Sequence, residues 1–410
     1  MGLQCVDCKQ GRGLKLNFSQ ASTFVIPSTA GENVIKKSDF ILQPYSKSDN
    51  LRATWQVLST LVPIILLWVL AVQAVAFSAW LLVPIIILMT LFSSRCFSLM
   101  HDCGHYSLFT AKKANRAIGF TFGVLNAIPQ YPWSRGHAFH HKTNGDWDKY
   151  RGPSALISTE DFAKLSPKAQ WQYEVIRHPV MLLPGGFFYL AIKPRLALIL
   201  GIYGFIQHAF ASWQTDPKLN VAAVFASYRS RHWYTKAEFW DLLLNNICVI
   251  GGWIGMSYWL GAGLFFSVYF ANLTFSAAIF IYVFFVQHNF EGSYAHKTEG
   301  WDYLQGAIAG SSYLELPGIL KWFTASIGFH NIHHLSERIP NYHLEACHQA
   351  NLHLLGGIKT LHLRDLPACA KYILWDAEAG TLVSISEFRR QAQLQVEQNQ
   401  EPQLVVTGGQ

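Results

Sequence analysis

Charged residues are scarce in this sequence. Only 14% of its 410 residues are Asp, Glu, Lys or Arg, whereas 51% are hydrophobic. Soluble globular domains carry about 25% charged residues, so this shortage excludes an ordinary soluble enzyme. Several apolar stretches approach the roughly 20 residues that a helix needs to cross a bilayer. The composition therefore predicts a polytopic membrane protein.

A disulfide framework is also missing. The seven cysteines are scattered and odd in number, which indicates a reducing compartment. Cys5 and Cys8 form a single CxxC pair without a second pair downstream, and a structural zinc ion needs more ligands than one pair provides. We therefore expect no zinc site there. Residues 1–50 contain no apolar core, so we expect no cleavable signal peptide.

Four apolar stretches predict membrane-spanning helices. Residues 57–77 and 80–99 form a first tight hairpin, and residues 242–260 and 264–286 form a second one. The stretch 180–213 is also apolar, but Lys193-Pro194-Arg195 interrupts it, and a charge at the bilayer centre costs about 2.5–3.5 kcal/mol. We therefore predict interfacial helices for this stretch, and a membrane span remains the alternative.

Basic residues indicate how the hairpins are oriented. Lys and Arg flank the outer ends of both hairpins, and the short turns between their helices carry no charge. Because cytoplasmic segments of membrane proteins are enriched in Lys and Arg, we place the outer helix ends and both termini in the cytoplasm. The net charge of +7 is then a membrane signal, and we expect no nucleic-acid partner.

The predicted fold is an all-α integral membrane protein. It consists of four transmembrane helices in two hairpins, interfacial helices and a cytosolic helical cap. We divide the chain into a cytosolic, irregular arm (1–50), a membrane domain (51–385) and a disordered tail (386–410). The tail is rich in Gln and Glu, a composition typical of disorder.

Eight of the seventeen histidines fall into three clusters. The second and third clusters share the pattern HxxHH, whose histidines lie on one face of a helix. Imidazole suits iron, zinc, copper and nickel, and eight imidazoles exceed what one ion can bind, so we predict two metal ions. The clusters are His101 and His105; His137, His140 and His141; and His330, His333 and His334.

The predicted topology places all three clusters on the cytoplasmic face, where they can converge. His288 ends the fourth span as His101 ends the second, and we expect it to be a ninth ligand. Asp102, beside His101, is a candidate to orient an imidazole from behind the metal. The other histidines, among them His362, are interpreted as surface groups or satisfied core groups.

Several other residues near the clusters have an ordinary interpretation. We interpret three carboxylates as solvated surface charges and two tryptophans as interfacial anchors. The carboxylates are Asp146, Asp148 and Glu337, and the tryptophans are Trp133 and Trp322.

The motifs HDCGH, HAFHH and HNIHH, ordered between two hydrophobic hairpins, resemble the three histidine boxes of membrane fatty acid desaturases. The stretch 285–341, with VQHNFEG, SSYLELP and GFHNIHHLSERIPNY, is similar to the bacterial and cyanobacterial acyl-lipid delta-12 (omega-6) type. The resemblance covers roughly residues 55–350. It implies that the boxed histidines bind two non-haem Fe²⁺ ions, with His288 matching a further ligand histidine. His178-Pro179 is followed by Val180, not by the HPGG haem signature, so it also implies a separate electron donor, ferredoxin or cytochrome b5.

The expected activity is O₂-dependent insertion of a cis double bond into a fatty acyl chain, linked to a lipid rather than to a thioester carrier. We expect a bacterial inner membrane as its location. The first alternative is a hydroxylase or ketolase that acts on carotenoids, alkanes or sphingolipids. A membrane metal transporter or metal-binding protein is the second, but a transporter requires ionisable ligands within the spans, and the middle of each predicted span lacks charge.

Overall fold

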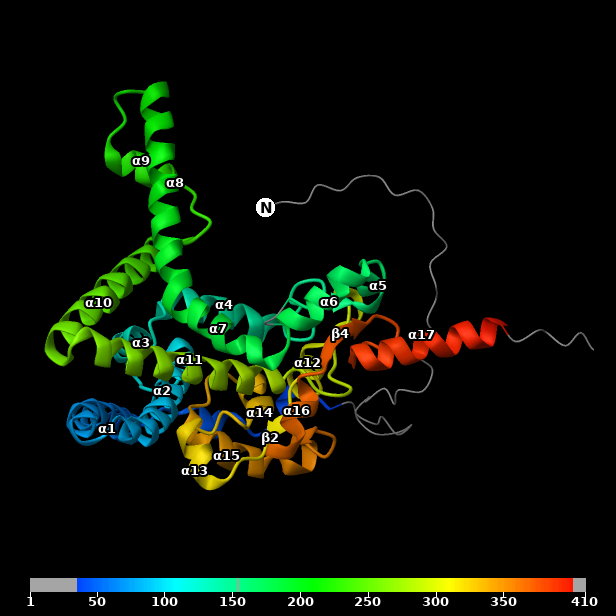
Figure 1. Cartoon of the computed structure of the whole chain (residues 1–410). Coiled ribbons are helices and arrows are strands. Elements are labelled where there is room, and N and C mark those ends of the chain that lie inside the picture. The colour runs from blue at the N-terminus through cyan, green and yellow to red at the C-terminus, as the bar shows by residue number, and fades with distance from the viewer. Residues whose placement is uncertain (1–34, 153–154, 401–410) are drawn as a thin grey trace, which may run out of the picture.

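The computed structural model describes residues 35–152 and 155–400 (Figure 1). The Cys5–Cys8 pair, most of the predicted arm and residues 401–410 of the predicted tail lie outside this part. The fold is mainly helical. The helices of the membrane part and the segment after it are α1 (Asn50–Phe77), α2 (Leu82–Gly104), α3 (Lys112–Leu125), α4 (Gln130–Thr143), α5 (Thr159–Ala163), α6 (Pro167–Ile176), α7 (Leu182–Phe187), α8 (Lys193–Thr215), α9 (Val221–Ser227), α10 (Lys236–Leu260) and α11 (Ala262–Val286). The remaining helices are α12 (Tyr303–Ile308), α13 (Gly318–Phe323), α14 (His330–Leu335), α15 (Asn341–Ala350), α16 (Leu366–Cys369) and α17 (Ile385–Gln400).

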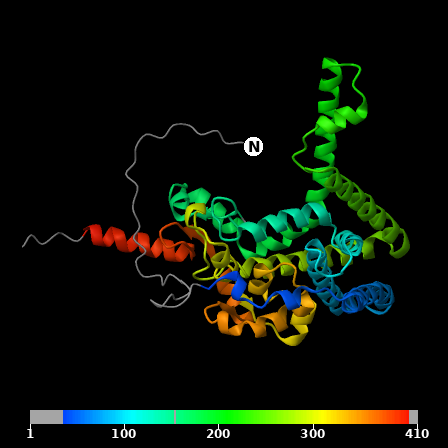
Figure 2. The same ribbon diagram turned by 180° about the vertical axis from the view of Figure 1, so that it is seen from behind.

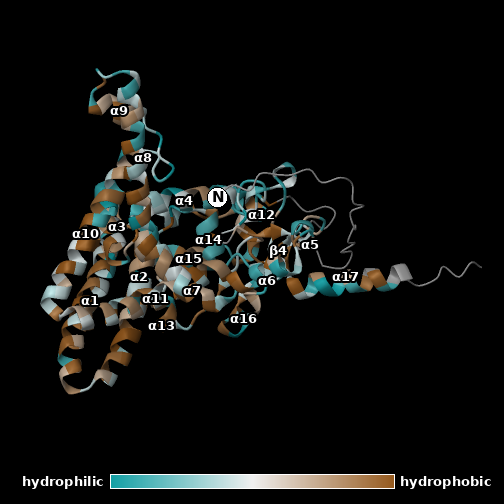
Figure 3. Ribbon diagram, turned by 45° about the horizontal axis from the view of Figure 1, so that its top comes forward, coloured by the Kyte–Doolittle hydropathy of each residue, from teal (hydrophilic) through white to brown (hydrophobic). Residues whose placement is uncertain are grey.

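Two helical hairpins form the apolar body of the molecule. Asp49 is the N-cap of helix α1. Its carboxylate accepts from the backbone N–H groups of Leu51 and Arg52 and so satisfies two donors at the helix start. Gly261, with φ of +80°, makes the sharp turn between α10 and α11, a conformation that costs glycine little. Helix α2 packs against both α1 and α11, and many large apolar side chains on α1 and α10 point outward. Figure 3 shows the α1–α2 hairpin coloured mostly as hydrophobic.

Five helical segments of the described part are long and apolar enough to cross a membrane, one more than the sequence predicts. Four of them contain the predicted spans, and the fifth is Pro179–Thr215. This segment runs from α7 through a π-helical stretch, Phe188–Ile192, into α8. The prediction of purely interfacial helices for residues 180–213 and of a four-span fold is therefore not confirmed. Helix α8 rises from the body of the molecule, and α9 lies beside its far part in both views (Figures 1 and 2).

One of the two charges that argued against a span, Arg195, is bound by polar groups of the protein, whereas Lys193 is exposed. Arg195 donates from Nε to Oδ1 of Asn246 at 2.8 Å and from its terminal nitrogens to Oδ1 of Asn245 at 2.6 Å and to the Ala127 carbonyl at 2.8 Å. These partners belong to α10 and to the turn after α3. Because polar groups of neighbouring segments bind the guanidinium, the insertion cost used in the prediction is reduced for Arg195.

The C-terminal part adds two small sheets to a fold that was predicted to be all-α. Strands β1 (Ile157–Ser158), β4 (Tyr372–Asp376) and β5 (Thr381–Ser384) form one sheet, in which β1 and β4 are parallel and β4 and β5 are antiparallel. Strands β2 (Tyr313–Leu314) and β3 (Thr360–Leu361) form a second, parallel pair. The strands are short and join segments far apart in sequence, so local periodicity gives little indication of them.

The predicted disorder of residues 386–400 is wrong, because helix α17 covers them. Ile385 and Phe388 are buried against the three-stranded sheet, and Glu387 accepts from the Ser384 backbone N–H at 2.7 Å. Two apolar side chains and one capping carboxylate thus start a helix within a polar composition. The described end of the N-terminal arm is also ordered: Phe40 is buried, and the Ile41 N–H donates to Oδ1 of Asn351 at 2.7 Å.

We expect Arg195→Ala to destabilise the protein, since it leaves Asn245 and Asn246 without their charged partner. Hydrogen bonds to charged groups contribute about 1.5–3 kcal/mol each, so the thermal unfolding midpoint in detergent should fall by several degrees. Lys236→Ala, at an exposed lysine on α10, is the control and should leave the midpoint unchanged. Equal midpoints for wild type and Arg195→Ala would show that this network does not hold α8 to α10.

Candidate metal centre

Four helices bring nine histidines together. His101 lies in the last turn of α2 and His105 caps that helix; α4 carries the second cluster, α14 carries the third, and His288 follows the end of α11. Their ring nitrogens form two groups, and within each group the candidate ligand atoms all lie within 4.8 Å of one another. The first group is His101, His105, His137, His141 and His333, and the second is His140, His288, His330 and His334. The predicted convergence of the three clusters and His288 is therefore observed.

Each HxxHH helix contributes to both groups. On α4, the i and i+4 histidines (His137 and His141) belong to the first group, and the i+3 histidine belongs to the second. On α14 the order is reversed, because His330 and His334 belong to the second group and His333 to the first. Residues at i and i+4 lie nearly above one another on a helix, whereas i+3 is displaced around the axis. The spacing thus lets one short helix serve two ligand groups.

Several ring nitrogens in these groups are buried without hydrogen-bond partners. This holds for Nε2 of His101 and for both ring nitrogens of His333. In the second group, Nε2 of His288 lies 3.0 Å from Nε2 of His140 and 2.9 Å from Nε2 of His330. A buried polar atom without a partner costs about 1–3 kcal/mol, and a bound cation would supply the partner. The donor sets therefore fit metal ions that take imidazole ligands.

Burial keeps the imidazoles neutral. It lowers the pKa of His288 to about 4, and, together with repulsion from neighbouring histidines, it lowers the pKa of the second- and third-cluster histidines well below their usual range. Desolvation disfavours the charged imidazolium, so the rings are neutral at physiological pH. Neutral imidazole is the form that donates a lone pair to a metal ion.

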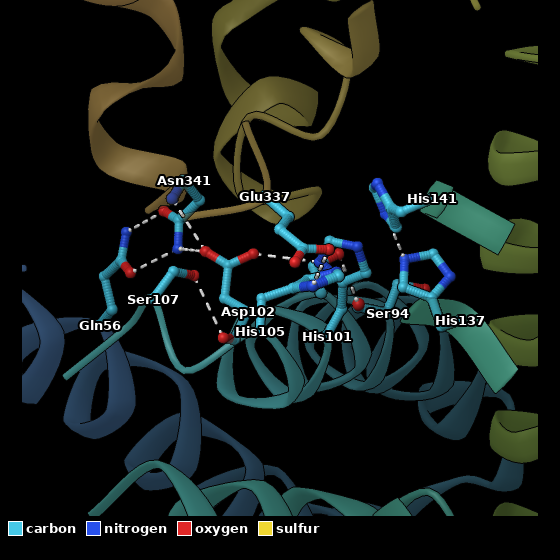
Figure 4. Close-up of polar contacts among 11 residues, drawn as sticks. Gln56, Ser94, His101, Asp102, His105, Ser107, His137, His141, Glu337 and Asn341 are labelled. Carbon is cyan, nitrogen blue, oxygen red and sulfur yellow. Dashed lines mark hydrogen bonds and ion pairs between the residues drawn. The ribbon is translucent and has the colours of Figure 1, made fainter. Parts of the chain in front are cut away.

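Asp102 orients the His101 ring by binding its Nδ1 atom, the ring nitrogen opposite the candidate ligand atom Nε2 (Figure 4). Nδ1 of His101 donates to Oδ1 of Asp102 at 3.1 Å, and Oδ2 of Asp102 accepts from the backbone N–H and from Nδ2 of Asn341 at 2.8 and 2.9 Å. Asn341 in turn accepts from Nε2 of Gln56 on α1 at 2.7 Å. This chain links α1, α2 and α15, and it leaves Nε2 of His101 directed at the first group. Asp102 thus lies where the sequence predicted an orienting carboxylate.

Two further histidines, His105 and His288, have an oxygen partner at Nδ1. Oε2 of Glu337 lies 3.2 Å from Nδ1 of His105, and Nδ1 of His288 donates to the Gly310 carbonyl at 2.8 Å. The contact with His105 lowers the pKa of Glu337, so this half-buried carboxylate is ionised. The interpretation of Glu337 as a solvated surface charge is therefore wrong. Its position three residues after the third cluster gave no sign that the loop after α14 folds onto the end of α2.

Two other ordinary interpretations also need correction. The Trp133 ring stacks on His137, with centroids 4.8 Å apart and planes at 13°, so this residue packs against the histidine groups rather than serving only as an interfacial anchor. Asp146 is fully buried, pairs with Lys149 at 2.7 Å and accepts from the Thr298 hydroxyl at 2.6 Å. Asp148 is exposed, as expected. Neither aspartate belongs to the two histidine groups.

A cavity of about 570 Å³ reaches the histidines between α2, α4, α7 and α11. His137 of the first group and His140 and His288 of the second form part of its wall, and much of the remaining wall is aromatic or aliphatic. Its main apolar lining residues are Phe97, Trp133, Leu182, Tyr189, Phe280, Ile281 and Phe284. The arrangement can therefore hold an aliphatic group against both candidate metal positions.

We expect Asp102→Asn and Glu337→Gln to lower metal content without unfolding the chain. Carboxylates that orient ligand histidines typically contribute about 10–100-fold in metal affinity. Metal per chain, measured by mass spectrometry of purified protein after mild chelation, should fall for both variants. Asp148→Asn is the matched control and should retain wild-type metal. Wild-type metal in Asp102→Asn would mean that the Asn341 network holds α2 in place without acting on the ligand.

Comparison with known proteins agrees with this site. The family model for fatty acid desaturases matches residues 78–361. A fatty acid desaturase from Bacillus subtilis is 30% identical over 344 residues, which cover 83% of this chain and 87% of that protein. The chloroplastic omega-6 fatty acid desaturase of Arabidopsis thaliana is 24% identical over 325 residues (78% and 64%), and an sn-1 acyl-lipid omega-3 desaturase (ferredoxin) from Nostoc is 26% identical over 299 residues (72% and 74%). The resemblance seen in the histidine motifs is thereby confirmed: the chain belongs to the fatty acid desaturase family, and it is an oxidoreductase that acts on fatty acyl chains.

Proposed function

We propose that this enzyme inserts a cis double bond into a fatty acyl chain at a di-iron centre held by the nine histidines, with regiochemistry of the delta-12/omega-6 type. The observation that carries the proposal is the apolar cavity whose wall includes histidines of both groups. The omega-6 relative supports the regiochemistry. The reaction balances as R–CH₂–CH₂–R′ + O₂ + 2 e⁻ + 2 H⁺ → R–CH=CH–R′ + 2 H₂O.

Iron, when bound, supplies the one capacity that the side chains lack, the use of O₂ to remove hydrogen from an unactivated methylene. The chain's own residues position the reactants. Asp102, Glu337 and the Gly310 carbonyl fix the ring orientation of three ligands. Phe97 and Phe280 stack face to face, with ring centroids 3.6 Å apart, and form an apolar wall that directs the acyl chain past the histidines. Holding two adjacent methylenes at one place selects the carbons that react.

The position of the cavity favours a substrate that stays in the membrane. Its wall includes residues of α7 and of the following π-helical stretch, at the start of the apolar segment Pro179–Thr215. Lys193 is the sole lysine or arginine among the lining residues that the structure describes, whereas the several phosphates of a CoA thioester would call for a cluster of cations. An acyl chain attached to a membrane lipid fits this wall better than a soluble thioester.

The two external electrons come from a separate protein in this proposal, a ferredoxin or a cytochrome b5. The name of the Nostoc relative, a ferredoxin-type desaturase, supports the first choice. We place the histidine groups and both termini on the cytoplasmic side of a bacterial inner membrane. The similarity to the Bacillus subtilis desaturase supports a bacterial setting, and the charge distribution around the hairpins supports the orientation.

Expression in a host with a simple fatty acid profile tests the proposal. We expect a new cis alkene, located by mass spectrometry of derivatised fatty acids, at the delta-12 position. His101→Ala, His140→Ala and His333→Ala should each abolish the product and lower bound iron, because each removes a ligand. His362→Ala is the control, since His362 is half-buried and pairs with Glu315 and Asp365 instead. A hydroxy or keto product without an alkene would reject desaturation in favour of a hydroxylase or ketolase.

Chain-length selection can be tested at Gly185, which lines the cavity and has no atom within 4 Å of the position of an added Cβ. Gly185→Leu should fit without backbone strain and shorten the space for the acyl chain. We expect the ratio of C16 to C18 products to rise several-fold in lipid analysis by gas chromatography. Gly251→Leu on α10, equally unobstructed but outside this cavity, should leave the ratio unchanged. An unaltered ratio in Gly185→Leu would show that the acyl chain does not occupy this cavity.

A further inference from the structure

A second hollow reaches the histidines from another direction. It has a volume of about 430 Å³ and shares no described lining residue with the cavity of about 570 Å³ that we propose for the acyl chain. Its wall comes from the start of the described chain, α4, α12 and the segment that ends α14. We call it the basic vestibule and define it by Lys37, His141, Lys142, His334, Glu337 and Arg338.

The vestibule touches both histidine groups at once. His141 belongs to the first group and His334 to the second, and their rings stack with centroids 4.2 Å apart and planes at 22°. Both rings are almost fully buried, so the vestibule reaches them at its inner end. An electron that enters here is one imidazole away from either candidate metal position.

The rim of the vestibule is positively charged. Lys37, Lys142 and Arg338 are exposed there, and Lys142 and Arg338 form no ion pair within the described chain. Among the described lining residues Glu337 is the single acidic one, and it is already engaged with His105. Lys37 lies 4.7 Å from the centre of the Tyr303 ring, and the Tyr303 hydroxyl donates to the His334 carbonyl at 2.8 Å. This contact ties one rim cation to the backbone of a ligand histidine.

The composition of the vestibule favours an aqueous partner over a lipid surface. None of its lining residues is among the large apolar side chains that the described part of the chain exposes, whereas α1, α2 and α10 expose many. A rim of one charge sign steers a partner of the opposite sign and raises its association rate at low salt. The vestibule therefore suits an acidic protein better than the hydrocarbon boundary of the membrane.

We propose that the basic vestibule is the docking and electron-entry site for an acidic one-electron carrier protein. This inference rests on the proposed function, because desaturation consumes two external electrons. The carrier docks twice in each turnover, gives up one electron each time, and leaves oxidised. His141 and His334 would carry the two electrons inward, and these electrons, two protons from solution and the two hydrogen atoms removed from the substrate together reduce O₂ to two waters.

Stopped-flow reduction of the iron-loaded protein tests the docking site. The probes are two acidic carriers, a reduced [2Fe–2S] ferredoxin and a reduced cytochrome b5, with dithionite as a small reductant that needs no docking. We expect Lys142→Glu/Arg338→Glu to raise the half-saturating concentration of the productive carrier about tenfold or more at low ionic strength. Added salt should also no longer slow the reaction, since carboxylates replace two of the three rim cations that attract the carrier. Reduction by dithionite and the iron content should stay at wild-type values.

Lys168→Glu/Lys371→Glu is the matched control, because both lysines are exposed and lie outside the vestibule. Unchanged carrier saturation in Lys142→Glu/Arg338→Glu, or an equal effect in the control, would overturn the docking site. So would a variant that loses binding to anionic lipid vesicles but keeps wild-type carrier kinetics, since the vestibule would then face the membrane. If the carrier reduces the protein with saturable kinetics but no alkene forms, the result would count against the proposed desaturation and leave the docking site supported.

Discussion

The structure depends on the gathering of nine imidazoles at the point where two helical hairpins end. Seven of these residues are buried and the other two, His105 and His137, are half-buried, and several of the ring nitrogens in the set have no protein partner. Such an arrangement is costly for an apo protein and becomes favourable when cations occupy the two groups. The rest of the fold serves this convergence: α2 and α11 bring their ends together, and the segment after α11 returns α14 to the same place.

Much of the site was readable from the sequence, because its signal is local. The spacing of His137, His140 and His141 on one helix is visible in five letters, and the apolar runs before His101 and His288 predict where those residues emerge. The division of the nine histidines into five and four was not predictable. It depends on how α4 and α14 are rotated against each other, and only the packed structure fixes that rotation.

The errors have a common physical origin in long-range partners. Arg195 was treated as a charge in lipid, because its partners lie on another helix about 50 residues away. Glu337 was treated as solvated, because its partner His105 is distant in sequence. The helix after Ser384 was missed because its apolar anchors, Ile385 and Phe388, are only two residues in a Gln-rich stretch, and the sheet that buries them is assembled from remote strands.

Helices α4 and α14 divide their histidines between the two groups in opposite ways, so movement of either helix affects both candidate metal positions. Each helix contributes histidines to both groups, so a small rotation or shift of either helix moves ligand atoms of both groups together. The separation between the two candidate metal positions is then set by the helical pitch and by the packing of α4 against α14, not by flexible loops. An ion bound at one group would therefore hold both helices in place and favour binding of a second ion at the other group.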